Sequence, residues 1–387
     1  MIRTRWRATA AGATLFILGQ LVLAAPVGAT TGPTTVVADM PSAVPAGRFW
    51  TFNDFFPRTV TVQTGSDLQF INEGFHTFTV LPVGSNARQD WRTNGVGIDD
   101  TDDSTLNLNG TTRSEFNIPA LLPTCGPTPL PGCDFDGSSV VNVSPFGPPG
   151  PVDVHVSAAP GTYFFICRIH AGMSGKLNVV PADAQVPSPA AVQKQIAKQV
   201  EKDLKGAWAA DKKATDDSVT QNDDGSRTLH VTAGTSSNDG KVALLEFFPR
   251  NLAAKPGDKV EFTPRSPNEP HTVTFPGDLG TEMVNLCEDG STDTPFTGSC
   301  PGNPFGPDEV ELDGGNGVWQ VTVPGPNGVG TVSDSGIIAP HKFTQMLGAS
   351  KTDVLNEWTI SLAGAAPGTY TYVCQIHDGM DGSITVN

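Results

Sequence analysis

The chain has 387 residues, enough for two domains or three, each with a core of its own. Its formal net charge of −16 excludes a nucleic-acid partner, because a phosphate backbone requires clustered Lys and Arg. The 42 glycines and 33 prolines favour short strands and turns over helices.

The N-terminus has the pattern of an export signal. Arg3, Arg5 and Arg7 precede the apolar run AAGATLFILGQLVLAA, and small residues then suit cleavage after Ala29. The alternative is an uncleaved membrane anchor, since the run is only slightly short of a membrane span. We expect residues 1–29 to be a signal peptide, the protein to be exported to the periplasm or secreted, and no membrane span after signal removal.

Two stretches of the chain repeat one pattern. Each starts at an FFPR tetrapeptide (55–58 and 247–250), passes a glycine turn, and follows an alternating strand to a histidine. A second alternating segment comes next, and PGTY-x3-C closes the last part of the pattern. Such alternation is typical of half-buried strands. The sequence predicts an internal duplication of an all-β sandwich, with domains at 30–182 and 226–387.

The copies differ in their insertions, expected at 84–118 in the first and 308–355 in the second. Four cysteines outside the repeated motif lie in irregular stretches. Among their three possible pairings, the local ones cost the least chain entropy to close. We therefore expect the disulfides Cys125–Cys133 and Cys287–Cys300, which suit an oxidising compartment.

Residues 183–225 between the copies are predicted to be a helical linker. Ser188 before Pro189 is typical of a helix start, and Gly206 of a helix end. An apolar stripe able to lie on a neighbouring domain recurs every four residues, at Val192, Ile196, Val200 and Leu204. The opposite face of the helix is rich in lysine and is predicted to be solvated, and a polar tether follows at about 215–225.

Each copy ends in Cys-x2-His-x2-Met, as CRIHAGM at 167–173 and CQIHDGM at 374–380. With the upstream histidine, each copy supplies two imidazoles, one thiolate and one thioether. The soft sulfur ligands favour Cu(I), whereas imidazole also suits Cu(II), so this set suits a copper that changes oxidation state. Zinc is the main rival, but it more usually takes His, Cys and carboxylate. A purely structural role in the core is the other alternative. Four ligands in the same order, complete in both copies, argue against it.

These motifs, NEGFH with PGTYFFICRIHAGM and NEPH with PGTYTYVCQIHDGM, resemble those of the cupredoxins, the small blue copper proteins. The loop spacing is similar to that of amicyanin, whereas plastocyanin has a longer gap before its Met. The resemblance covers most of 34–181 and 226–387 and implies two tandem Greek-key β-sandwiches joined by a helical linker. It also implies two type 1 copper ions per chain, with the ligands His76, Cys167, His170 and Met173 in the first copy and His271, Cys374, His377 and Met380 in the second.

The resemblance carries three finer expectations. Cupredoxins often have Asn after the first ligand histidine, so a hydroxyl of Thr77 or Thr272 would have to replace its hydrogen bond. The loop histidine is expected near the surface, where it passes electrons. Arg168 beside the first site, and Asp378 with Asp381 just beyond it beside the second, then predict a lower reduction potential at the second site.

A fold alone leaves several functions open. We expect an electron carrier between a redox protein donor and acceptor, and not an enzyme. Extracytoplasmic copper buffering is an alternative, although the chain has no Met- and His-rich run. A copper oxidoreductase, such as a nitrite reductase, needs further histidines. The chain has seven, none in a His-x-His pair, which excludes a trinuclear oxidase. The histidines left over are His155, which is expected to face solvent, His230 and His341.

Overall fold

The computed structural model describes residues 33–95, 98–99, 115–116, 122–126, 132–144, 150–214, 219–275, 277, 285–286, 292–293, 319–325, 328–335, 338–340, 356–374 and 376–387. Pro33–Asn387 form one compact unit. The predicted signal peptide lies outside the described residues. In the part of the chain that is described, no helix combines the length and apolar character needed to span a membrane.

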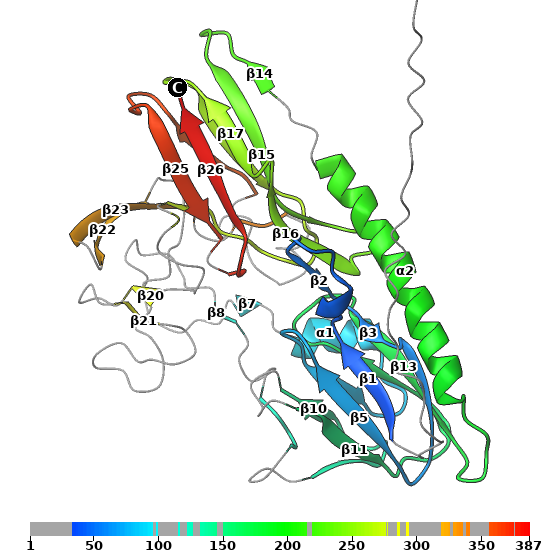
Figure 1. Cartoon of the computed structure of the whole chain (residues 1–387). Helices are drawn as coiled ribbons and strands as arrows, with labels where there is room; N and C mark the ends of the chain where they lie inside the picture. The colour runs from blue at the N-terminus through cyan, green and yellow to red at the C-terminus, as the bar shows by residue number, and fades with distance from the viewer. Residues whose placement is uncertain are drawn as a thin grey trace, which may run out of the picture. The chain divides into compact units, whose positions relative to one another are not determined.

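The first copy contains two five-stranded sheets (Figure 1). One has the strand order β3-β1-β5-β11-β9, from β1 (Thr34–Ala38), β3 (Phe55–Phe56), β5 (Ser66–Asn72), β9 (Cys133–Phe135) and β11 (Val152–Val156). The other has the order β10-β6-β12-β13-β4, from β4 (Thr59–Gln63), β6 (Phe78–Leu81), β10 (Val141–Val143), β12 (Gly161–Ile166) and β13 (Ser174–Val180). A short 3-10 helix, η1 (Pro41–Ala43), follows β1.

The second copy also contains two sheets. One has the order β2-β16-β15-β18-β24, with β14 paired to β15, from β2 (Trp50–Phe52), β14 (Val219–Gln221), β15 (Arg227–Ser236), β16 (Val242–Phe248), β18 (Lys259–Pro264) and β24 (Trp358–Ser361). The other has the order β17-β26-β25-β19-β23-β22, from β17 (Asn251–Ala254), β19 (Thr274–Phe275), β22 (Trp319–Gly325), β23 (Gly328–Asp334), β25 (Gly368–Val373) and β26 (Asp381–Val386). Two small pairs stand apart: β7 (Ile98–Asp99) with β8 (Glu115–Phe116), and β20 (Asn285–Leu286) with β21 (Thr292–Asp293).

The two copies share one topology. The parallel pair β1–β5 corresponds to the parallel pair β15–β18, and the parallel pair β4–β13 corresponds to β17–β26. The structure explains why particular residues recur in both copies. The hydroxyl of each PGTY tyrosine donates to a carbonyl four residues earlier, at 2.9 Å in both copies. Gly175 and Gly382 each lie against an aromatic ring of the paired strand, where a Cβ would overlap Phe165 or Tyr372. The predicted duplication of a β-sandwich is therefore confirmed in its strand order.

The helix between the copies, α2 (Pro189–Ala214), begins where the sequence predicts but ends later. The backbone N–H of Ala191 donates to the Ser188 hydroxyl at 3.3 Å, which caps the first turn. The predicted stop at Gly206 is wrong. This glycine gives close contact, since a Cβ there would lie 3.1 Å from Cβ of Ser237, and good helix formers follow it. Part of the expected tether is also ordered, as strand β14.

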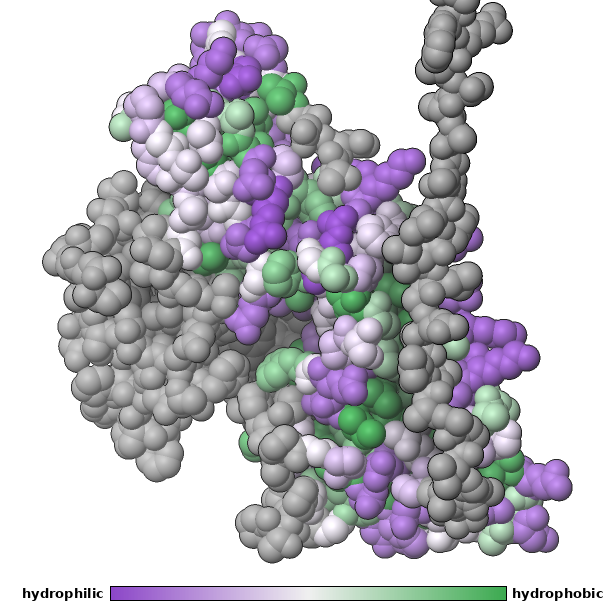
Figure 2. All heavy atoms as spheres, viewed as in Figure 1, coloured by the Kyte–Doolittle hydropathy of each residue, from purple (hydrophilic) through white to green (hydrophobic). Residues whose placement is uncertain are grey.

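The predicted apolar stripe of α2 packs through Ile196, Val200 and Leu204, but not Val192, against a hydrophobic cluster that includes Phe52, Phe56 and Phe248. The stripe residues are only half-buried, however, and the buried side chains of the helix include Gln199, Asp203 and Asp211. The lysine-rich face is exposed as expected, and Figure 2 shows hydrophilic side chains along the edge of the molecule where Figure 1 draws α2.

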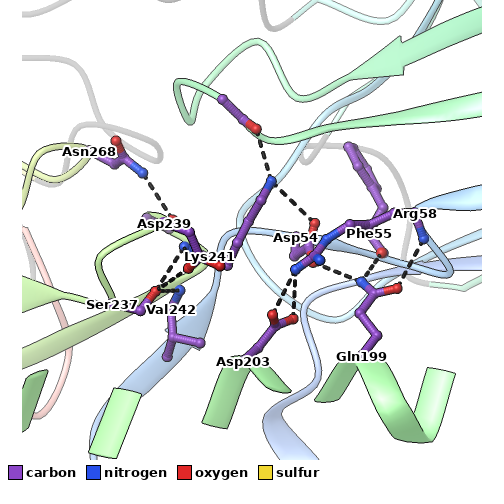
Figure 3. Close-up of polar contacts among 12 residues, drawn as sticks. Asp54, Phe55, Arg58, Gln199, Asp203, Ser237, Asp239, Lys241, Val242 and Asn268 are labelled. Carbon is purple, nitrogen blue, oxygen red and sulfur yellow. Dashed lines mark hydrogen bonds and ion pairs between the residues drawn. The ribbon is translucent and has the colours of Figure 1, made fainter. Parts of the chain in front are cut away.

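A polar network joins α2 to both copies (Figure 3). The Arg58 guanidinium contacts Asp54 at 2.5 Å and Asp203 at 2.7 Å, and Gln199 donates to Asp54 at 2.7 Å. From the second copy, the Lys241 ammonium lies 3.4 Å from the same Asp54. Strand β2 pairs with β16, so a strand from the first copy extends a sheet of the second. These contacts hold the two copies together.

The expected disulfide Cys125–Cys133 is present, with an S–S distance of 2.08 Å. The expected Cys287–Cys300 pair lies outside the described residues. The first insertion contains a helix that the sequence did not predict, α1 (Ala87–Asn94), capped by the Asn86 side chain. Trp91 of this helix is buried against Leu81 and Ile166, and so anchors the insertion beside the end of β12.

Candidate metal centres

The first Cys-x2-His-x2-Met motif forms a tight turn between two paired strands. Cys167 follows β12 directly, and Met173 directly precedes β13. The backbone N–H of Cys167 donates to the Met173 carbonyl at 2.9 Å, and that of Met173 donates to the His170 carbonyl at 3.1 Å. These two bonds close the turn and hold the three loop ligands on it. His76 precedes β6, whose strand pairs with β12.

This turn brings three donor atoms together as the sequence predicts. Nδ1 of His76 lies 3.0 Å from Nδ1 of His170, and the Cys167 sulfur lies 3.8 Å and 3.6 Å from these two nitrogens. The point equidistant from the three atoms is about 2 Å from each, close to the bond lengths of about 2.0–2.3 Å at which a metal binds nitrogen and sulfur. All three residues and Met173 are buried.

The second motif repeats this turn. The backbone N–H of Cys374 donates to the Met380 carbonyl at 2.8 Å, and that of Met380 donates to the His377 carbonyl at 3.3 Å. The Cys374 sulfur lies 3.6 Å from Nδ1 of His377, and a ligand atom from each of His271, Cys374 and His377 lies within 4.8 Å of the other two. The backbone of His271 is held by a bridge to Ile338.

Both ligand cysteines have a lowered pKa, which favours the thiolate. Burial alone would raise the pKa of Cys167, but the imidazoles of His170 and His76 hold it well below its usual value. The same balance, with His377 and His271, lowers the pKa of Cys374. The thiolate is the form of cysteine that binds metals. Both cysteines are free of disulfides.

His271 is the most isolated of the predicted ligands. It is fully buried, and among the described residues neither ring nitrogen has a hydrogen-bond partner. Burial lowers its pKa, which keeps the ring neutral and its lone pair available. Gly234, at φ +64°, lies so close to the ring that a Cβ would overlap it. A buried ring nitrogen without a partner is costly, and a metal ion would give one of the two His271 nitrogens a partner.

The two loop histidines share one neighbour, Glu269. Its Oε1 lies 3.5 Å from Nε2 of His170, and its Oε2 lies 3.6 Å from Nε2 of His377. Burial would lower the pKa of each histidine, but Glu269 and the cysteine thiolates raise it to about 9 for His170 and about 10 for His377. Although burial opposes ionisation of Glu269 as well, the two histidines lower its pKa to about 2.

The surroundings of the two sulfurs differ. Cys167 accepts a hydrogen bond from the backbone N–H of Ile169, in its own loop, at 3.4 Å. Cys374 accepts one from the backbone N–H of Thr272, next to the distant histidine, at 3.3 Å. In the first site the Thr77 hydroxyl accepts from the backbone N–H of Arg168 at 2.7 Å, so the expected replacement of an asparagine by threonine holds there.

Two expectations drawn from the resemblance are corrected. The loop histidines do not lie at an open surface: His170 is 8% exposed, and the His377 side chain is 12% exposed, because each faces Glu269. The charges expected to separate the potentials are paired, Arg168 with Asp90 at 3.4 Å and Asp381 with Arg250. The part of the argument that used Arg168 and Asp381 therefore loses its basis, and the lower potential at the second site stays a prediction.

The remaining histidines do not join either site. His155 is about half exposed on β11, as predicted, and contacts Asp67 at 2.9 Å, while His230 on β15 contacts Glu261 at 2.9 Å. His341 lies outside the described residues. Among the residues that are described, only the two His-Cys-His groups could hold a metal ion.

Two functional residues were not predicted from the sequence: Glu269, which contacts a histidine of each site, and Asn53, which supports Glu269. Asn53 Nδ2 donates to Oε1 of Glu269 at 2.5 Å. The signal in the sequence was the Asn-Glu dipeptide that precedes both histidines. It could not show that Glu269 is buried while its counterpart Glu73 is exposed.

The donor set fits copper better than zinc. Two imidazoles and a thiolate in a buried triangle, beside a buried methionine, match the type 1 copper arrangement, whereas structural zinc sites take four Cys or His ligands. Met173 and Met380 are held in place by the backbone bonds of their turns. The identity of the eight ligands stays a prediction that this geometry fits.

No protein-family model matches the sequence, and no curated protein matches it. Among solved structures, a reduced auracyanin from the photosynthetic bacterium Roseiflexus castenholzii is 17% identical, covering 40% of this chain and 100% of its own, with a TM-score of 0.21. Auracyanin B is 21% identical, covering 40% and 94%, with a TM-score of 0.21. A plastocyanin from Dryopteris crassirhizoma is 20% identical, covering 38% and 100%, with a TM-score of 0.18.

At such TM-scores these likenesses do not assign the fold, which rests on the strand order and the paired ligand sets of the chain itself. The described residues form two cupredoxin-like β-sandwiches in tandem with one long helix between them, and each sandwich carries a buried His-Cys-His set that suits copper.

Proposed function

We propose that this protein carries single electrons on two type 1 copper ions, one held by His76, Cys167, His170 and Met173 and the other by His271, Cys374, His377 and Met380. The observation that carries the proposal is the buried triangle of two imidazole nitrogens and a thiolate sulfur in each copy. When bound, copper would supply one-electron exchange between Cu(I) and Cu(II).

The residues of the chain prepare each site for such exchange. The short turns hold the loop ligands by backbone hydrogen bonds, and paired strands carry the rest, so the donor atoms have little freedom to rearrange. Burial keeps water away from the sulfur, and a backbone N–H donates to it in both sites. Such hydrogen bonds and apolar surroundings tune the reduction potential.

The proposal includes export and redox protein partners, a donor and an acceptor. Its support is the N-terminal pattern of residues 1–29 and the disulfide Cys125–Cys133, since disulfides persist in oxidising compartments. A copper buffer would favour exposed and exchangeable ligands, whereas seven of the eight predicted ligands are buried and the His377 side chain is only 12% exposed.

A copper oxidoreductase would need a further copper site open to substrate. His155 and His230 each contact a carboxylate and join no ligand group among the described residues. We therefore propose a carrier and not an enzyme.

The test is a reductive titration of the copper-loaded protein, combined with assays for oxygen and nitrite reduction. A carrier takes up two electrons per chain reversibly and turns over neither substrate at enzyme-like rates. Turnover that is lost in His155→Gln, His230→Gln or His341→Gln would instead reveal a catalytic copper.

A further inference from the structure

Glu269 is a buried acidic residue that belongs to neither ligand set. It lies two residues before His271 and is 5% exposed. A carboxylate at such a position is costly unless it is paired on all sides. The partners of Glu269 come from both copies of the repeat: Asn53 and His170 from the first, and His377 from the second.

The two carboxylate oxygens divide these partners between them. Oε1 faces Nε2 of His170 at 3.5 Å, and Oε2 faces Nε2 of His377 at 3.6 Å. The other nitrogen of each ring, Nδ1, faces its own cysteine sulfur at 3.6 Å in both sites. Each loop histidine therefore has one nitrogen directed at its predicted metal and the other directed at the same carboxylate.

Contacts around Glu269 hold the two copies in this arrangement. Asn53 directly follows β2 and is also buried, and its Nδ2 donates to Oε1 of Glu269 at 2.5 Å. The Lys241 ammonium of the second copy donates to the carbonyl of Gly172, inside the first metal loop, at 2.9 Å. Figure 3 shows Lys241 between Asp54 and this loop. The bridge through Glu269 is thus part of a packed interface.

The repeat supplies an internal comparison. Glu73 holds the equivalent position of the Asn-Glu dipeptide before His76, but its side chain is exposed. The same residue type in the same sequence context is therefore solvated in one copy and buried between the two sites in the other. The β-sandwich of the first copy forms with an exposed acid at this position, so the fold of the repeat does not by itself require Glu269 to be buried.

From this geometry we propose that Glu269 couples the two metal sites, acting as a positioning residue that holds the outer nitrogens of His170 and His377 at the same time. The inference rests on the proposed function, since it takes both sites to bind copper. A carboxylate partner fixes the orientation of a ligand histidine and increases its basicity, and loss of such a partner typically costs about 10–100-fold in metal affinity. Because Glu269 serves both histidines, one substitution should weaken both sites.

The first experiment needs no copper. In the metal-free protein, imidazole N–H groups of His170 and His377 that face Glu269 should be protected from exchange in nitrogen-proton NMR spectra. Glu269→Gln should alter both resonances, and the matched control Glu73→Gln should alter neither. Loss of protection at only one histidine, or at none, would overturn the bridge whether or not the protein binds copper.

The second experiment measures coupling in proteins that keep one site, made with Cys374→Ser or Cys167→Ser. Competition titrations with a copper chelator should show that Glu269→Gln lowers the Cu(II) affinity of each site by about 10-fold or more. The reduction potential of each site should rise by up to about 59 mV per tenfold loss of Cu(II) affinity relative to Cu(I). Glu73→Gln should change neither quantity.

Coupling is then read from the protein with both sites intact. Loading of one site should change the affinity of the other, and this difference should shrink in Glu269→Gln, as a double-mutant cycle measures. Asn53→Ala leaves the carboxylate but removes its donor, so it should weaken both sites by less than Glu269→Gln does. Independent sites with unchanged affinities in Glu269→Gln would contradict the coupling, whereas absence of copper binding in the unmodified chain would contradict the proposed function itself.

Discussion

The two metal centres share their turns but differ in what surrounds the sulfur and the histidines. In both, the cysteine N–H donates to the methionine carbonyl, and the methionine N–H donates to the histidine carbonyl. The first sulfur accepts from Ile169 in its own loop, while the second accepts from Thr272 beside the distant histidine. The motif thus determines the geometry of the ligands, and neighbouring strands decide how each site is tuned.

The largest effect expected is the loss of one site at a time. Cys167→Ser or Cys374→Ser removes the thiolate that gives rise to the intense visible absorption, so each should remove about half of the colour. Absorption spectra and copper content of the two variants and of the double variant measure this. If either single variant lost all of the colour, the two sites would not be equivalent in ligand set.

The contacts that hold the copies together can be tested by stability. Arg58→Gln leaves the buried carboxylate of Asp203 without its arginine partner and Asp54 with Lys241 alone, so it should lower the free energy of unfolding by about 2–4 kcal/mol. The matched control is Arg250→Gln, which removes the exposed pair with Asp381 and should cost less than about 1 kcal/mol. Denaturant unfolding measures both. Equal costs would mean that the network around α2 contributes no more than a surface pair.

The threonine after the first histidine sharpens the comparison between the loops. Thr77→Val removes the hydroxyl that accepts from the Arg168 N–H and leaves this partly buried donor without that partner, at a cost of about 1–3 kcal/mol. Copper affinity should fall at the first site and stay unchanged at the second. Thr162→Val, at an exposed position on β12, is the control. An equal loss at both sites would show that the substitution acts through the fold and not through the loop.

The smallest effect expected concerns the paired charges. Asp90→Asn leaves Arg168 uncompensated, which should raise the potential of the first site, and Arg250→Gln leaves Asp381 uncompensated, which should lower that of the second. A charge near a partly solvated site contributes about 1 kcal/mol, or roughly 40 mV for one electron. Redox titration of the single-site proteins measures both shifts. A fall in potential at the first site, or a rise at the second, would contradict the electrostatic argument.

Much of this architecture could be predicted from the sequence, because the same pattern of strands and ligands occurs in both copies of the repeat. The alternation of the strands, the short disulfide Cys125–Cys133 and the cap at Ser188 are local patterns with local causes, and the structure confirms them. The ligand motif is also a local pattern, since one hydrogen-bonded turn carries its cysteine, histidine and methionine.

What the sequence could not show arises from contacts between the copies. Gly206 resembles a helix end, but it continues the helix because its small size allows contact with Ser237. The same limit applies to Glu269, whose local sequence matches that of the exposed Glu73, and to the loop histidines, which the docking of the two copies buries. Such contacts depend on residues far apart in the chain.

The most direct test of the two-copper account is a copper count on the loaded, unmodified chain beside its visible spectrum. The account predicts two coppers per chain, an intense thiolate-to-copper absorption, and its complete loss on reduction to Cu(I). A protein that holds two coppers without this absorption, or that holds none, would contradict it.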